Sequence, residues 1–125
     1  MVRTIVVGFG GGVGALTRFI FLDPSTVFPY STLLINVSGS FLITLFTYLW
    51  LERELLKGLL VTGFCGGFTT MSTFSSEVAV LFNLNIWVAC LYILLSVGLG
   101  VTGAVAGEKA ARLVKKRKRS SPYVS

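Results

Sequence analysis

Residues 63–77 read GFCGGFTTMSTFSSE and lie within a segment, residues 55–82, that is otherwise apolar enough to cross a membrane. The stretch contains three glycines, six hydroxyl side chains and one carboxylate, that of Glu77. Every polar group in a bilayer core must find a partner in the protein, because hydrocarbon offers none. A polar, glycine-rich interruption of a membrane span is therefore expected where the chain is buried in protein or lines a path for water or ions. The stretch predicts a transport protein.

The composition of the chain is typical of a membrane protein. Of its 125 residues, 54% are hydrophobic and 13% are charged, whereas soluble domains have roughly 25% charged residues. Four apolar segments approach or exceed the ~20 residues needed to span the hydrocarbon core. They are residues 4–22, 30–51, 55–82 and 86–106. Residues 1–108 are thus predicted to form an all-α membrane domain of four transmembrane helices, the third broken in mid-membrane.

The basic residues are distributed unevenly about the predicted membrane. Ten of the eleven Lys and Arg residues fall on the side that holds both termini and the connection after residue 51, and the exception is Arg18. The positive-inside rule places this side, and both termini, in the cytoplasm. Residues 109–125 are predicted to be a disordered, basic cytoplasmic tail. A polybasic cluster next to a membrane favours anionic lipid headgroups over nucleic acid as its partner.

Small or polar side chains recur at helical spacing in three of the predicted helices. They are Thr32, Asn36, Ser40 and Thr44 in the second, Gly66, Thr69, Thr70, Thr73 and Glu77 in the third, and Tyr92, Ser96, Gly100, Gly103 and Gly107 in the fourth. Such a stripe can join two helices, but three stripes together favour a polar pathway. Hydroxyl and amide donors suit a small, hard anion that exchanges its hydration shell for hydrogen bonds.

Two further features bear on such a pathway. Arg18, near the end of the first segment, either reaches the membrane surface or raises the local potential for an anion. Glycines spaced four apart, such as Gly8 with Gly12 and Gly10 with Gly14, predict close helix packing.

Three stretches resemble motifs of the Fluc (CrcB) family of fluoride-specific ion channels. Residues 11–19 (GGVGALTRF), 32–39 (TLLINVSG) and 63–77 are similar to its first-, second- and third-helix motifs, and the resemblance covers essentially the whole chain. It implies an inverted, antiparallel dimer of four-helix subunits in the bacterial plasma membrane, with two fluoride pores at the dimer interface. The implied activity is passive efflux of fluoride down its electrochemical gradient, which protects the cell.

The resemblance also implies roles for individual residues. Backbone carbonyls of Gly66 and Thr69 from both subunits would coordinate one structural Na⁺ that is not transported. Phe74 would line the pore, and Met71 stands where the family usually has a second phenylalanine, so that position lacks an electropositive ring edge. The other implied pore residues are Thr32, Asn36, Ser72, Thr73, Glu77, Tyr92, Ser96 and Arg18.

The charge distribution leaves the partner of the dimer open. A subunit that inserts in both orientations should have nearly balanced Lys and Arg, whereas this chain is biased to one side. The chain either forms an antiparallel homodimer or pairs with a paralogue of the opposite charge bias.

Other functions fit the sequence less well. A small four-helix multidrug or cation exporter needs a carboxylate in its first helix, and residues 4–22 have none. A holin-like protein without transport activity would account for the basic tail but not for three polar stripes. The chain has no histidine, metal-ligand cluster or nucleophile–base set, so an enzyme is not expected.

Overall fold

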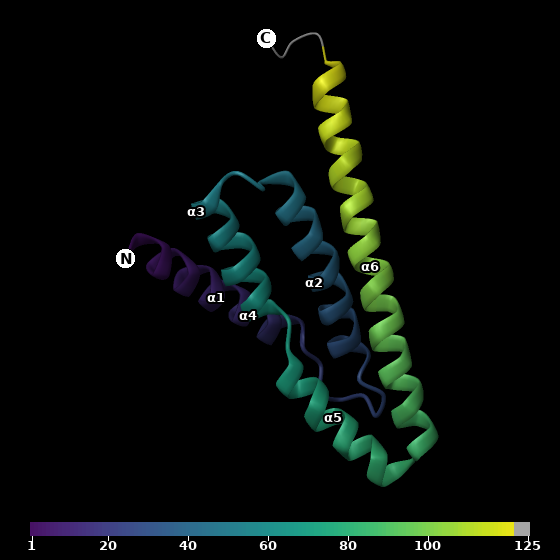
Figure 1. Cartoon of the computed structure of the whole chain (residues 1–125). Coiled ribbons are helices and arrows are strands. Elements are labelled where there is room, and N and C mark those ends of the chain that lie inside the picture. The colour runs from purple at the N-terminus through teal and green to yellow at the C-terminus, as the bar shows by residue number, and fades with distance from the viewer. Residues whose placement is uncertain (122–125) are drawn as a thin grey trace.

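The computed structural model describes residues 1–121, and every regular element in this range is a helix. Figure 1 shows long helices that run side by side in alternating directions, with the short α3 and α4 within the third pass of the chain. In chain order, the elements are α1 (Val2–Phe21), α2 (Tyr30–Leu49), α3 (Glu54–Lys57), η1 (Gly58–Cys65), α4 (Gly66–Phe68), α5 (Met71–Leu84) and α6 (Ile86–Ser120). The prediction of an all-α protein is confirmed for the described residues.

Three helices, α1, α2 and α6, are long and apolar enough to cross a membrane. They coincide with three of the four predicted segments, residues 4–22, 30–51 and 86–106. Their length and composition support a multi-pass membrane protein, as the sequence predicted.

The third predicted segment, residues 55–82, is not a single uninterrupted helix. α3, η1 and α4 follow one another through Phe68, and α5 begins at Met71. Between them, Thr69 (φ −75°, ψ 156°) and Thr70 (φ −144°, ψ 117°) have extended backbones. The chain continues past these residues without reversing its direction (Figure 1). Neither part alone has the ~20 residues of a membrane span, so only both together could cross.

The middle of this third pass is a π-helix, which the sequence did not predict. η1 is eight residues long, and its glycines Gly58 and Gly63 are both buried. A Cβ atom at Gly63 would lie 2.7 Å from the Val7 carbonyl oxygen of α1. The absence of a side chain therefore lets the two backbones meet. Most π-helical segments are single turns, often near functional sites.

α1 packs against η1 and α4 through glycines. A Cβ at Gly14 would overlap the Phe64 carbonyl, and one at Gly67 would overlap the Gly11 carbonyl. The expected close packing is thus confirmed for this part of α1. By contrast, a Cβ atom added at Gly8 or Gly12 would have no neighbour within 4 Å, so that face of α1 is open in the single chain.

α6 packs against α2 through the small residues of its stripe. Gly103 lies against the Val37 carbonyl, and Gly107 lies against the Phe41 carbonyl and the Thr44 side chain. The hydroxyls of Ser40 and Thr44 donate to carbonyls of their own helix. At these positions the polar stripes of α2 and α6 therefore form a helix–helix contact, and their hydroxyls are not available as donors.

The basic end of the chain differs from its prediction. α6 continues to Ser120, so residues 109–120 are helical rather than disordered. Lys and Arg are good helix formers, and cations near a helix C-terminus interact favourably with its dipole. Arg112 and Glu108 add an ion pair one turn apart, at 2.6 Å. Residues 122–125, the rest of the predicted disordered tail, lie outside the described residues.

Replacing Gly14 with alanine should lower the melting temperature of the purified protein in detergent by about 4 °C or more, because the added methyl group has no space beside Phe64. The matched control is Gly12→Ala on the same helix, which meets nothing within 4 Å. Equal melting temperatures for the two variants would contradict the packing of α1 against η1 and α4.

Candidate functional site

The interruption after α4 is held by side chains from two other helices. Extended residues leave peptide groups without the partners that a helix supplies. Asn36 of α2 satisfies both backbone polar groups of Thr70. Its Nδ2 donates to the Thr70 carbonyl at 3.0 Å, and its Oδ1 accepts from the Thr70 N–H at 2.8 Å. Arg18 of α1 donates from Nη1 to the Thr69 carbonyl at 3.1 Å. Both side chains were predicted site residues, and the fold brings them to one place.

The position of Arg18 is more specific than either alternative drawn from the sequence. The guanidinium is partly buried and contacts the carbonyl of the residue that ends α4. A cation is favourable there, because the C-terminal end of a helix carries partial negative charge. Arg18 thus acts as a cap of α4 in this structure.

Thr70 is the N-cap of α5 and was not among the predicted pore or Na⁺-site residues. Its Oγ1 accepts from the Thr73 N–H at 3.1 Å and donates to the Thr73 hydroxyl at 3.0 Å, and it lies 3.3 Å from the Ser72 hydroxyl. Thr70 is itself buried. A threonine that precedes a helix is a known N-cap signal, so the sequence did contain the information.

A second cluster forms around Glu77 of α5. Its Oε1 accepts from the Thr32 hydroxyl at 2.7 Å, and its Oε2 accepts from the Tyr92 hydroxyl at 2.8 Å. Thr32 and Tyr92 are completely buried, so three predicted site residues from α2, α5 and α6 meet here. In this arrangement both hydroxyl protons are committed to the carboxylate rather than free for another anion.

Glu77 also faces a small cavity at the end of the α1–α2 loop. The cavity has a volume of about 210 Å³, and Asp23 lines it as well. Ser25 donates its backbone N–H to Asp23 Oδ1 at 2.9 Å, and hydrogen bonding with Ser25 lowers the pKa of Asp23. The lining of the cavity therefore includes a carboxylate that is ionised at neutral pH.

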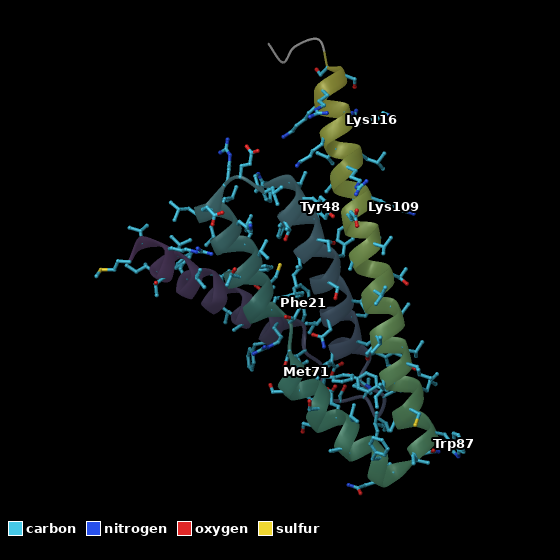
Figure 2. All side chains as sticks on the ribbon, viewed as in Figure 1. Phe21, Tyr48, Met71, Trp87, Lys109 and Lys116 are labelled. Carbon is cyan, nitrogen blue, oxygen red and sulfur yellow. The ribbon has the colours of Figure 1, made fainter. Side chains whose placement is uncertain are left out.

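Phe74 and Met71, which stand at the two positions where the family usually has phenylalanine, have different surroundings. Phe74 is half-buried, with its ring centroid 5.1 Å from that of Tyr92, and it packs against the hydrophobic cluster to which Tyr92 belongs. Met71, at the start of α5 (Figure 2), is 72% exposed, and Ser72 beside it is exposed too. The single chain therefore does not enclose Met71 and Ser72.

Ser96 lies one turn after Tyr92 on α6. Among the described residues, its Oγ is a buried side-chain atom without a hydrogen-bond partner. A buried hydroxyl left unpaired costs free energy, so Ser96 retains a donor that this chain does not use.

The carbonyls expected to bind Na⁺ lie at the interruption. The Thr70 N–H, which an unbroken helix would direct to the Gly66 carbonyl, donates to Asn36 instead and so releases that carbonyl. The Thr69 carbonyl keeps one lone pair beside its bond to Arg18. Hard cations such as Mg²⁺ take about six oxygens, so one chain supplies an incomplete set. The donors fit such an ion only if a second subunit contributes equally and offsets the nearby guanidinium charge.

Comparison with known proteins identifies the family. A family model described as "CrcB-like protein, Camphor Resistance (CrcB)" matches residues 5–108. The chain belongs to the CrcB family. This confirms the resemblance seen in its three helix motifs.

Relatives within the CrcB family are similar over nearly their full length. The chain is 37% identical to "Fluoride-specific ion channel FluC 2" of Bacillus licheniformis, over 91% of this chain and 93% of the relative. It is 39% identical to "Fluoride-specific ion channel FluC" of Ruminiclostridium cellulolyticum, over 91% and 95%. It is 42% identical to the protein of the same name from Novosphingobium aromaticivorans, over 86% and 94%. Membership of this ion-channel family agrees with the three helices that are long and apolar enough to cross a membrane, and it gives no support to an enzyme.

The Asn36→Ala variant should lose both bonds to Thr70 and leave a part-buried N–H and carbonyl unpaired. We expect its melting temperature in detergent to fall by about 4 °C or more, since each lost partner costs about 1–3 kcal/mol. Asn83→Ala is the matched control, because within residues 1–121 the exposed Asn83 amide bonds only to the Ala79 carbonyl of its own helix. A control variant that melts as early as Asn36→Ala would show that Asn36 does not hold the interruption.

Proposed function

We propose that this CrcB-family chain is a subunit of a fluoride-specific channel, through which fluoride leaves the cell passively down its electrochemical gradient. The observation that carries the proposal is the polar interruption at Thr69 and Thr70, held by Arg18 and Asn36 inside an apolar helix bundle. The relatives named as fluoride-specific channels supply the identity of the ion.

The chemistry of the uncommitted groups supports an anion. The Thr73 hydroxyl accepts from Thr70, so its own proton is free to donate, and the buried Ser96 hydroxyl has no partner among the described residues. The positively polarised ring edge of Phe74 adds a further contact for an anion. Such donors replace the water around a small, hard ion without offering a strong site that would retain it.

The exposed groups at the start of α5 support a pore at a subunit interface. Met71 and Ser72 are exposed in the single chain, and the glycine face of α1 around Gly8 and Gly12 is open. A second, antiparallel subunit would enclose the path on this side. That subunit is either a copy of this chain or an oppositely charge-biased paralogue.

A structural Na⁺ is part of the same proposal. The released Gly66 carbonyl and the Thr69 carbonyl of two subunits would hold the ion at the centre of the dimer, where it would offset the partial negative charge of the helix ends. The ion is not transported, and this chain contributes only backbone oxygens to it.

The orientation follows from charge and aromatic residues. The cationic end of α6 and the two termini would lie in the cytoplasm. Trp87 is 81% exposed at the opposite end of α6 from Lys116 (Figure 2), which suits the outer membrane interface. With the interior at negative potential, an open fluoride path releases the anion without nucleotide hydrolysis.

Phe74→Ile should abolish fluoride efflux from liposomes while it leaves assembly intact, because isoleucine has no polarised ring edge. Efflux is measured with a fluoride electrode after valinomycin is added to carry K⁺, using this chain alone or with the paralogue. Phe82→Ile is the matched control, since Phe82 lies on the same helix and is exposed.

Size-exclusion profiles of the variants separate lost conduction from lost assembly. Undiminished flux in an assembled Phe74→Ile protein would refute the role of this ring. Equal efflux of chloride and fluoride from the unmodified protein would refute fluoride specificity.

Ser120→Cys in a Cys90→Ser background tests the orientation. If the partner is a paralogue, an impermeant maleimide should label the new thiol only after the cells are lysed, because the basic end of α6 then holds it in the cytoplasm in every copy. The remaining native thiol, Cys65, is buried. Labelling of a large fraction in intact cells would instead show that the chain inserts in both directions.

A further inference from the structure

A groove lies where the end of α2 and the α2–α3 connection meet the C-terminal part of α6. Its volume is about 660 Å³. Its apolar lining comes from Leu49, Trp50 and Leu51. The cationic lining consists of six side chains: Arg53, Arg112, Lys115, Lys116, Lys118 and Arg119. None of these residues belongs to the fluoride path described above.

The positive charge of the groove is largely uncompensated. Its only carboxylate is that of Glu52, which forms no ion pair within the part of the chain that the structure describes. Of the six cations, Arg112 alone has an ion-pair partner among these residues, Glu108. Five cationic groups without an ion-pair partner among these residues thus line one cavity, and a single carboxylate lines it with them, a distribution that attracts an anion.

The cations are arranged by the helix rather than scattered. Arg112, Lys115, Lys116 and Arg119 are spaced by three and four residues, so they share one face of α6. Like charges at this spacing repel one another, and a bound anion relieves the repulsion. Arg112 is held at the inner end, with its guanidinium 5.8 Å from the centre of the Tyr48 ring.

The location of the groove indicates the kind of anion. α6 extends past the α2–α3 connection (Figure 1), and Lys116 lies on this extension, farther along α6 from Trp87 than Lys109 (Figure 2). Tyr48 and Trp50 stand at the end of a membrane-spanning helix, where aromatic residues mark the headgroup level. An apolar lining next to a cationic rim at that level fits a molecule with both acyl chains and a phosphate.

We propose that this groove binds the phosphate of an anionic phospholipid of the cytoplasmic leaflet, with an acyl chain against Leu49, Trp50 and Leu51. Lys116 and Arg119 contact the phosphate from α6. The site is independent of fluoride conduction, because it lies at the opposite end of α2 from Thr32 and Glu77.

The test uses two variants with equal loss of charge on the same helix. Lys116→Gln with Arg119→Gln removes two cations from the groove, whereas Lys109→Gln with Arg117→Gln removes one lysine and one arginine that do not line it. The full-length proteins in neutral detergent are titrated with phosphatidylglycerol, phosphatidylcholine or inorganic phosphate. Melting temperature and retention of lipid in native mass spectrometry are both recorded, and the lipid-free melting temperature shows that each variant is folded.

We expect phosphatidylglycerol to give a saturable rise in melting temperature in the unmodified protein and in the Lys109/Arg117 variant. The groove variant should bind it about tenfold or more weakly, because each basic residue near an anionic lipid contributes to affinity. Phosphatidylcholine should have no comparable effect.

Equal weakening in both variants would overturn the proposal, since total charge rather than the groove would then decide binding. A shift with inorganic phosphate equal to that with phosphatidylglycerol would also overturn it, because the occupant would then be a free anion and not a lipid.

Discussion

The hydrogen bonds between Asn36 and Thr70 are the interaction on which the rest of the site depends. Two extended residues in an otherwise apolar pass expose peptide groups that hydrocarbon cannot satisfy. Asn36 satisfies the N–H and the carbonyl of Thr70, and Arg18 satisfies the Thr69 carbonyl. Because the Thr70 N–H is turned to Asn36, the Gly66 carbonyl is released, and α5 starts afresh with Thr70 as its cap. One amide thus both permits the interruption and fixes where the next helix begins.

The glycines of α1 determine whether Arg18 can take part. Gly14 lies directly against the backbone at Phe64, one turn before Arg18 on the same helix. A larger residue at Gly14 would move α1 away and would withdraw the guanidinium from Thr69. The small-residue packing typical of membrane helices therefore serves a second purpose here, since it sets the distance between a cation and a helix end.

Some hydroxyl groups of the site are committed, because they already donate a hydrogen bond within the protein, and others are uncommitted. Only the uncommitted groups can donate to an anion without breaking an existing hydrogen bond. Thr32 and Tyr92 donate hydrogen bonds to Glu77, whereas the hydroxyl protons of Thr73 and Ser96 have no acceptor among the described residues. An anion that used the donors around Glu77 would have to displace a carboxylate. The uncommitted donors lie on α5 and α6, and Met71 on α5 is open to a neighbouring subunit. A fluoride path that uses the hydroxyls of Thr32 and Tyr92 as well as those of Thr73 and Ser96 therefore needs either a second chain or a movement of Glu77.

The sequence by itself determined the class of the fold, the positions of three helices able to cross a membrane, the unusual polar stretch and the family. Apolar segment length and motif spacing are local properties of the chain. Disorder was expected for residues 109–125, whereas residues 109–120 are helical, since helix propensity and the favourable position of the cations near the helix C-terminus outweighed charge repulsion. Only the tertiary structure decided that Arg18 caps α4, that η1 is a π-helix and that Glu77 joins Thr32 to Tyr92. These outcomes depend on which backbones approach across 15 to 51 residues of chain, and no spacing within one helix encodes that approach.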